Sequence, residues 1–235
     1  MSTTLDAWIQ PGHLTDTAIE RYREAFTSHP ARLLVLEDLL LDDQANRLAD
    51  FLRADAQYEA RRGLYSSEDV NVAEADWQAA PDEDRFFRFS QLVGIAPEAQ
   101  LSSRTLAYMQ FRSLFAQPDV QDFFQAITDL SLAYSQEDIG VHAMHPGDFL
   151  RSHDDNNRER QLAMVLYLTP EWKPEYGGRL HVVEPGGNVT PIDATYNSMV
   201  IFDVRSGATH QVEPVTAAAE GTARRTIGGW YQKGG

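Results

Sequence analysis

The chain has 235 residues, of which 43% are hydrophobic, so it can bury one large core. It contains no cysteine, which excludes disulfides, cysteine-ligated metal centres and thiol nucleophiles. Its net charge of −15 repels the phosphates of nucleic acids and anionic lipids, so we expect neither nucleic acid nor membrane as a partner.

Residues 1–26 contain no basic region followed by an apolar one, so we expect no signal peptide. No apolar run of the chain approaches the roughly 18 residues that a membrane-spanning helix needs. Together with the absence of cysteine, these features predict a cytoplasmic protein.

The first elements are predicted from apolar spacing and from capping residues. The pattern over 14–27 predicts a short amphipathic helix, and 32–40 predicts a buried strand that runs into a turn. Asp42 or Asp43 is expected to cap the next helix, which ends near Arg53.

Residues 61–85 are polar and acidic and show no clear period. A loop of this length inside a compact domain is a lid, a disordered segment or a plain surface loop, and the sequence leaves the choice open. Two helices follow, over 101–116 and 118–131, with a break at Gln117 and Pro118. We therefore expect residues 1–131 to form a mostly helical flank that includes a lid loop.

The remainder, residues 132–235, has the residue pattern expected of a β core. Short runs rich in Val, Ile, Tyr and Phe alternate with Gly, Pro, Asn and Asp, which is typical of a sandwich or barrel. The predicted strands are 139–145, 149–153, 160–168, 178–184, 189–192, 198–204, 209–213 and 223–232. The predicted fold is mainly β with flanking helices, and the chain is expected to form a single domain, 1–235.

His153 and Asp155 stand at the end of a predicted strand, two residues apart, so their side chains point to the same side and Asp154 points away. Such a pair can place an imidazole nitrogen and a carboxylate oxygen on one metal ion. His210, which opens a later predicted strand, is the best third ligand. Two histidines and one carboxylate are typical of non-haem Fe(II) oxygenases. The alternative is a solvated turn in which Asp154 or Asp155 caps backbone N–H groups.

Several motifs follow one another in a specific order. They are H-x-D at 153–155, LYLTPEW at 166–172, GGRL at 177–180, the histidine at 210 and RRTIGGWY at 224–231. This order resembles the prolyl 4-hydroxylase-like branch of the Fe(II)/2-oxoglutarate dioxygenases, and the texture is closest to the ribosomal-protein prolyl hydroxylases. The resemblance covers about 141–232, and the N-terminal half matches only in outline. It implies a double-stranded β-helix core, of the jelly-roll or cupin kind, with N-terminal helices packed on it.

The resemblance also implies cofactors and the residues that hold them. Fe(II) would be bound by His153, Asp155 and His210, and the distal carboxylate of 2-oxoglutarate by Arg224, a planar and permanently charged donor. The remaining cosubstrate donors would be Tyr167 and Thr226, which shares a strand face with Arg224. The other implied cosubstrate is O₂, and ascorbate is compatible with this chemistry. A core tyrosine with a satisfied hydroxyl is the alternative for Tyr167.

Four further residues are candidates for substrate contact. Arg151 shares a strand face with His153, and His145 stands where many relatives carry a tyrosine. Tyr65 and Trp77 lie in the acidic loop, at the position along the chain where relatives have a mobile substrate loop. A structural role is the alternative for each of them.

Three functions compete at this point. The resemblance favours a hydroxylase that oxygenates a C–H bond of a prolyl or similar residue in a peptide or protein, with conversion of 2-oxoglutarate to succinate and CO₂. The second is a hydroxylase of a free amino acid or small natural product. The third is a catalytically silent β-barrel module that binds a ligand. The carboxylate of Asp155 favours hydroxylation, because related halogenases lack it. The sequence does not define an oligomeric state.

Overall fold

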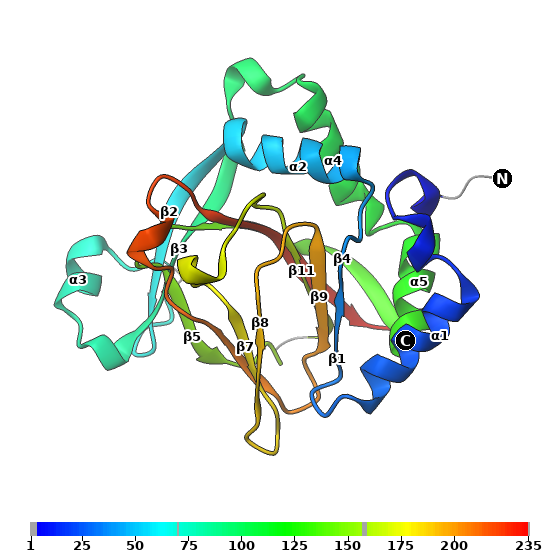
Figure 1. The fold of residues 1–235 in the computed structure, drawn as a ribbon. Helices are drawn as coiled ribbons and strands as arrows, with labels where there is room; N and C mark the ends of the chain where they lie inside the picture. The colour runs from blue at the N-terminus through cyan, green and yellow to red at the C-terminus, as the bar shows by residue number, and fades with distance from the viewer. Residues whose placement is uncertain (1–3, 70, 157–158, 235) are drawn as a thin grey trace.

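The computed structural model describes residues 4–69, 71–156 and 159–234 (Figure 1). Its described strands form one sheet of 11 strands in the order β1-β9-β6-β11-β4-β3-β5-β10-β7-β8, with β2 paired to β3. The strands are β1 (Leu33–Leu36), β2 (Ala56–Leu64), β3 (Arg85–Ile95), β4 (Leu132–Met144), β5 (Phe149–His153), β6 (Arg160–Tyr167), β7 (Leu180–Val183), β8 (Val189–Ile192), β9 (Ser198–Asp203), β10 (Thr209–Val212) and β11 (Arg224–Lys233).

β3 joins the two halves of this sheet. Its Ser90 pairs with Ala143 of β4, and its Phe87 pairs with Leu150 of β5. The sheet therefore bends from the β1-β9-β6-β11-β4 side to the β5-β10-β7-β8 side, with antiparallel pairing throughout. This is a double-stranded β-helix core, and the predicted fold class is confirmed.

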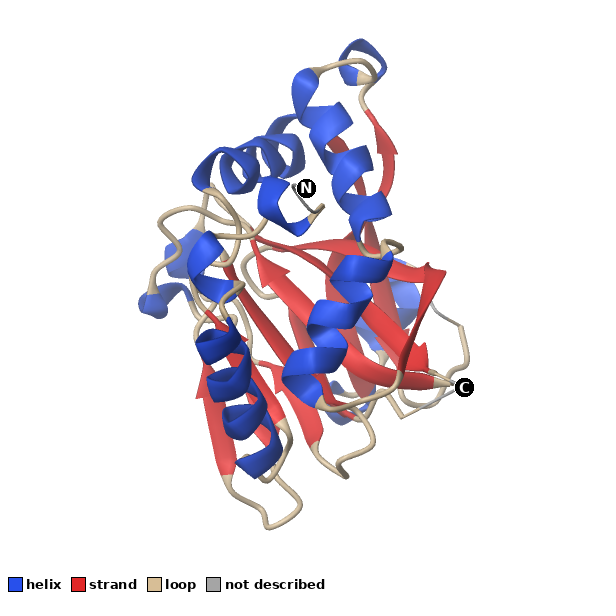
Figure 2. Ribbon diagram, turned by 90° about the vertical axis from the view of Figure 1, so that its right-hand side faces the viewer, coloured by secondary structure: helices blue, strands red, loops and turns tan. Residues whose placement is uncertain are grey.

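Helices cover the outer face of the first half of the sheet (Figure 2). They are α1 (Asp16–Ser28), α2 (Asp42–Ala54), α4 (Ser103–Leu114) and α5 (Pro118–Thr128). Strand alternation decides what each side chain meets. In β6, Leu162 and Leu166 pack into the cluster beneath the helices, whereas Ala163 and Tyr167 face the interior of the β core. The shared packing of helices and sheet supports the proposed single domain.

Most predicted helices and strands are confirmed within a few residues, but the predicted cap of α2 is wrong. Leu41 is the residue before α2, and no side chain caps that helix, because Asp42 and Asp43 both lie in its first turn. The strand predicted over 32–40 to run into a turn is confirmed: β1 ends at Leu36, and Asp38, with a φ of 49°, turns the chain.

Most of the segment predicted as a loop over 61–85 is the connection between β2 and β3, since β2 ends at Leu64 and β3 begins at Arg85. The prediction missed the strand ends on either side and the short helix α3 (Glu74–Ala79), which stands out to one side in Figure 1. The β2–β3 hairpin is held by backbone pairing and by ion pairs such as Arg62–Glu74. Most side chains of the hairpin are half-exposed. Its sequence therefore lacks the regular alternation of apolar and polar residues that identifies a core strand.

β4 also begins earlier than predicted, at Leu132. None of the described helices has the length and apolarity needed to cross a membrane.

Candidate metal and cosubstrate site

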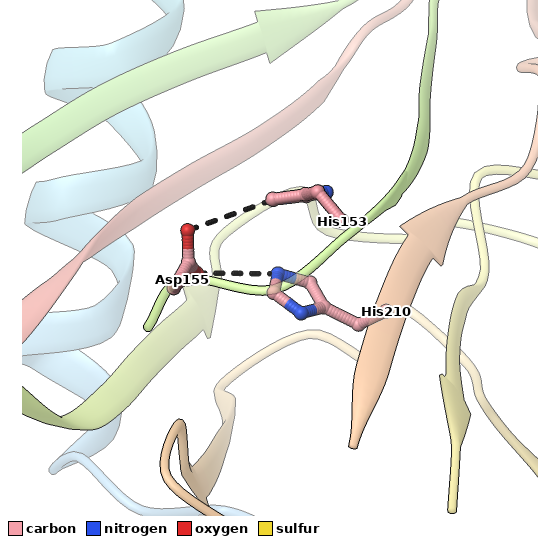
Figure 3. A group of neighbouring side chains, drawn as sticks. All are labelled: His153, Asp155 and His210. Carbon is pink, nitrogen blue, oxygen red and sulfur yellow. Dashed lines mark ion pairs between the residues drawn. The ribbon is translucent and has the colours of Figure 1, made fainter. Parts of the chain in front are cut away.

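The pairing of β5 with β10 brings the two predicted histidine ligands together. His153 and His210 are direct partners in the antiparallel register, so their side chains share a face, and their ring centroids lie 4.2 Å apart. Asp155 Oδ2 lies 3.2 Å from His210 Nε2, and Asp155 Oδ1 lies 3.6 Å from His153 Nε2. One ligand atom from each residue lies within 4.8 Å of the others, and Figure 3 shows the three side chains converging.

The protonation states at this site suit a divalent metal. Burial acts to raise the pKa of the Asp155 carboxyl, but hydrogen bonding and charge from His210, with support from His153 and Trp230, hold that pKa below its usual value. Burial, together with the charge of His210, lowers the pKa of His153. An ionised carboxylate beside a neutral imidazole is the state that binds a metal ion. Asp154, predicted to point away from this site, is exposed but also contributes to the lining of the cavity beside it.

Two residues that the sequence did not single out as site residues hold the Asp155 carboxylate. The indole Nε1 of Trp230 donates to Asp155 Oδ2 at 3.1 Å, and Arg160 Nη1 lies 3.7 Å from Asp155 Oδ1. The Arg160 guanidinium stacks 3.5 Å above the Trp230 ring and pairs with the buried Asp138. The LYL and RRTIGGWY motifs place β6 and β11 in the core, but only their pairing reveals that Arg160 and Trp230 meet beside the carboxylate.

We expect Trp230→Phe to weaken the binding of a divalent metal by about ten-fold, because the ring stays while the hydrogen bond that orients Asp155 is lost. Titration of the metal-free protein with Mn(II) measures this affinity. Trp172→Phe is the matched control, because its indole donates to the Gly177 carbonyl instead. Equal Mn(II) affinity of wild type and Trp230→Phe would show that the indole does not orient the ligand.

A cavity of about 420 Å³ opens beside the three convergent residues. Its walls are mainly apolar and aromatic, and its lining includes five of the six residues predicted to hold metal or cosubstrate, namely His153, Asp155, His210, Arg224 and Thr226. The sixth, Tyr167, packs against Arg224, whose guanidinium carbon lies 4.9 Å from the centre of the tyrosine ring.

The Arg224 end of the cavity carries a buried charge with no counter-ion among the described residues. Arg224 is 4% exposed, and its Nε and the Tyr167 hydroxyl have no hydrogen-bond partner in the part of the chain that the structure describes. Burial lowers the pKa of Arg224 and raises that of Tyr167. A buried, unpaired guanidinium is costly unless a ligand completes it. A carboxylate of 2-oxoglutarate fits this place in charge and in donor geometry.

Two of the predicted substrate residues, Arg151 and Tyr65, do not line the cavity but lie beside residues that do: Arg151 follows Leu150, and the Tyr65 ring stacks on Phe86. The Arg151 guanidinium is tied to Asp82 and to the carbonyl of Arg85, so it fastens the connection after α3 to β5. Tyr65 is 51% exposed, and its hydroxyl donates to the Ser152 carbonyl at 3.1 Å. Substrate contact by both residues stays a prediction.

The other two predicted substrate residues do not line the cavity. His145 lies just beyond the end of β4 and is exposed, because the chain turns there toward β5. Trp77 is 4% exposed and packs against Phe149, with the Arg85 guanidinium over its ring. Substrate contact by these two residues also stays a prediction: Trp77 packs α3 against β5, and the histidine that β4 contributes to the cavity lining is His142.

Sequence reasoning also missed the aromatic wall of the cavity, formed by Phe86, Phe87 and Phe89 of β3. The Phe86 ring meets the His153 ring edge-on, at a centroid distance of 5.6 Å. The signal that could have found this wall is the run RFFRFS at 85–90, in which aromatic residues recur as they do in a strand.

Comparison with known families bears on these residues directly. Residues 139–232 match the family model of the 2OG-Fe(II) oxygenase superfamily. The matched span contains His153, Asp155, His210 and Arg224. The β core of this chain is therefore similar to the 2OG-Fe(II) oxygenase superfamily over those residues. This confirms the resemblance inferred from the motifs.

Proteins similar to this chain include ones named prolyl 3-hydroxylases. Prolyl 3-hydroxylase OGFOD1 of Xenopus laevis is 26% identical over 159 residues, which are 64% of this chain and 29% of that protein. Prolyl 3-hydroxylase sudestada1 of Drosophila melanogaster is 32% identical over 124 residues, 48% of this chain and 22% of that protein. The chain thus spans less than a third of the length of either relative.

A solved structure shares the fold of most of this chain. It is a prolyl hydroxylase from Trichoplax adhaerens in complex with a hypoxia inducible factor oxygen degradation domain peptide fragment. The TM-score is 0.59 at 14% identity, and the alignment covers 93% of this chain and 94% of that chain.

Proposed function

We propose that this chain is an Fe(II)- and 2-oxoglutarate-dependent dioxygenase that hydroxylates a prolyl or similar residue in a peptide or protein. The observation that carries the proposal is the pairing, in one cavity, of a two-histidine, one-carboxylate face with a buried arginine that lacks a counter-ion. O₂ is the second cosubstrate of this proposal, ascorbate a compatible reductant, and the cytoplasm the proposed compartment.

His153, Asp155 and His210 would hold Fe(II) and leave part of its coordination sphere open to other ligands. With 2-oxoglutarate bound beside it, such a metal would activate O₂ for the oxidation of an unactivated C–H bond, with conversion of 2-oxoglutarate to succinate and CO₂ as the source of the other two electrons. Arg224 binds the distal carboxylate of the cosubstrate in a dry site, where its charge acts strongly. The aromatic wall from β3 excludes water from the space beside His153 and gives an apolar substrate group a surface to pack on.

The choice of a prolyl group in a peptide or protein rests on two observations. Relatives of the core are named prolyl 3-hydroxylases, and a protein of the same fold is a prolyl hydroxylase in complex with a peptide fragment. The net charge of −15 further favours a substrate segment that carries positive charge.

The test begins with metal-free protein that receives Fe(II) and 2-oxoglutarate without oxygen and then O₂. Succinate is measured, and mass spectrometry detects the gain of one oxygen atom on proline-containing basic peptides or on free L-proline. Succinate release with oxygen gained by a peptide is the expected result. Oxygen gained only by free L-proline would overturn the peptide assignment. Failure of Fe(II)-reconstituted protein to release succinate with any substrate would contradict the hydroxylase itself.

A further inference from the structure

His142 lies on the same face of the sheet as Arg224, the arginine proposed to bind the cosubstrate. In the register of β4 with β11, His142 is the partner of Thr226, and Met144 is the partner of Arg224. Side chains of direct partners share one face of a sheet, and residues two apart on a strand share it as well. All four residues line the cavity, and Arg224 Nη1 lies 3.6 Å from Met144 Sδ.

From its position on β4, the imidazole of His142 points toward the three convergent residues His153, Asp155 and His210. A Cβ atom built on Gly140 would approach His142 Cε1 to 3.0 Å, so the ring lies over the glycine two residues earlier on β4. Gly140 pairs with Gly228 of β11, and two residues further along β11 Trp230 donates to Asp155. Along β11, the imidazole therefore lies between the guanidinium of Arg224 and the metal-binding carboxylate.

The surroundings of His142 leave its ring without a polar partner. Within the part of the chain that the structure describes, neither ring nitrogen accepts or donates a hydrogen bond, and the ring meets Phe89 edge-on at a centroid distance of 4.9 Å. Burial, with a smaller contribution from the charge of Arg224, lowers the pKa of His142 to about 4. The imidazole is therefore neutral near pH 7 and carries one N–H donor. The residue is half-buried at the cavity wall, so a ligand that enters the cavity can supply a hydrogen-bond partner.

We propose that His142 binds the cosubstrate directly, its imidazole N–H donating to the carboxylate at the metal-binding end of 2-oxoglutarate. This inference rests on the proposed function and adds a residue to it. Arg224 holds one end of a five-carbon dicarboxylate, and His142 lies on the path from Arg224 to the metal face, where the second carboxylate of that molecule must lie. The phenyl ring of Phe89 fixes the plane of the imidazole, so the donor direction is set before the ligand arrives.

The test measures 2-oxoglutarate affinity in Zn(II)-bound protein, which does not turn over. His142→Leu removes the donor, and we expect its affinity to fall about ten-fold or more, as for a lost hydrogen bond to a charged group. His142→Gln restores an N–H donor and should recover much of the affinity. His145→Leu, an exposed histidine three residues along the chain, should bind as wild type does. All variants should keep the wild-type affinity for Zn(II).

A second measurement detects ligand binding in the wild-type protein itself and uses His142→Leu only to assign the NMR signals. In protein labelled with ¹⁵N in its histidines, 2-oxoglutarate should shift the imidazole signals that are absent from His142→Leu. Wild-type affinity in His142→Leu, or imidazole signals that do not move, would overturn the role of His142 and leave the proposed function standing. Failure of wild-type protein to bind 2-oxoglutarate at all would overturn both.

Discussion

Replacing His210 with alanine is expected to weaken the binding of a divalent metal by about a hundred-fold or more, because it removes one of three protein ligands from the site. His153 and Asp155 remain, but two donors hold an ion far less tightly than a convergent set of three. Calorimetric titration of the metal-free protein with Mn(II) measures the affinity. The thermal stability of the metal-free variant should stay close to that of wild type, since His210 lies at the cavity and not in the packed cluster beneath the helices.

His181→Ala is the matched control for this experiment. His181 lies on β7, the strand next to β10, and its Nε2 lies 2.9 Å from a Glu213 carboxylate oxygen, outside the cavity. Its loss should leave Mn(II) affinity unchanged. If His210→Ala binds Mn(II) as tightly as His181→Ala does, then the three side chains converge without forming a metal site.

The second large effect is expected from Arg224→Met, which keeps a long side chain but removes the charge. We expect the affinity for 2-oxoglutarate to fall by about 30-fold or more, the scale for truncating one partner of a buried, hydrogen-bonded charge pair. Because Arg224 has no counter-ion among the described residues, the ligand-free variant should be at least as stable to heat as wild type. Two measurements on Zn(II)-bound protein check this: 2-oxoglutarate titration, and a thermal melt without ligand.

Arg225→Met supplies the comparison, because it alters the next residue on the same strand. Arg225 is half-buried outside the cavity, and burial lowers its pKa. Its replacement should leave 2-oxoglutarate affinity unchanged. A ligand affinity in Arg224→Met equal to that in Arg225→Met would remove Arg224 from the cosubstrate site.

The two variants together separate the metal site from the cosubstrate site. His210→Ala should lose metal and, with it, the part of 2-oxoglutarate affinity that the metal provides. Arg224→Met should keep metal affinity, since its guanidinium is not among the three convergent residues. A variant that lost both affinities through misfolding would also lose its cooperative thermal transition, which the melt detects.

The local sequence pattern was sufficient to predict several helices and strands and the candidate metal ligands. The amphipathic helix α1 and the core strand β6 follow from apolar spacing, since each buries one regular set of side chains against the core. The alternation of β5 and the spacing of His153 and Asp155 place two donors on one side. The motif order then predicts His210 and Arg224, which the fold brings into the same cavity.

Sequence reasoning was insufficient in two situations. In one, half-exposed side chains obscure the apolar alternation of a strand; in the other, two histidines near one strand end are both candidates for the cavity. β3 contributes an aromatic wall to the cavity, yet its half-exposed side chains alternate too weakly to mark a strand. His145 and His142 both lie near the end of β4; the sequence singled out His145, whereas His142 is the one that lines the cavity. The register with β11 decides between them, because it places His142 opposite Thr226 and leaves His145 beyond the paired residues.

By itself, the sequence determined the fold class, the order of the strands along the chain, and the residue types that carry the chemistry, because helix and strand periods and short motifs act over neighbouring residues. Only the tertiary structure decided that the carboxylate of Asp155 meets Trp230 and Arg160, that Arg224 is buried without a counter-ion among the described residues, and that His142 faces the cavity. The physical reason is that these relations depend on strand register, which pairs residues far apart in the chain and is set by packing of the whole sheet.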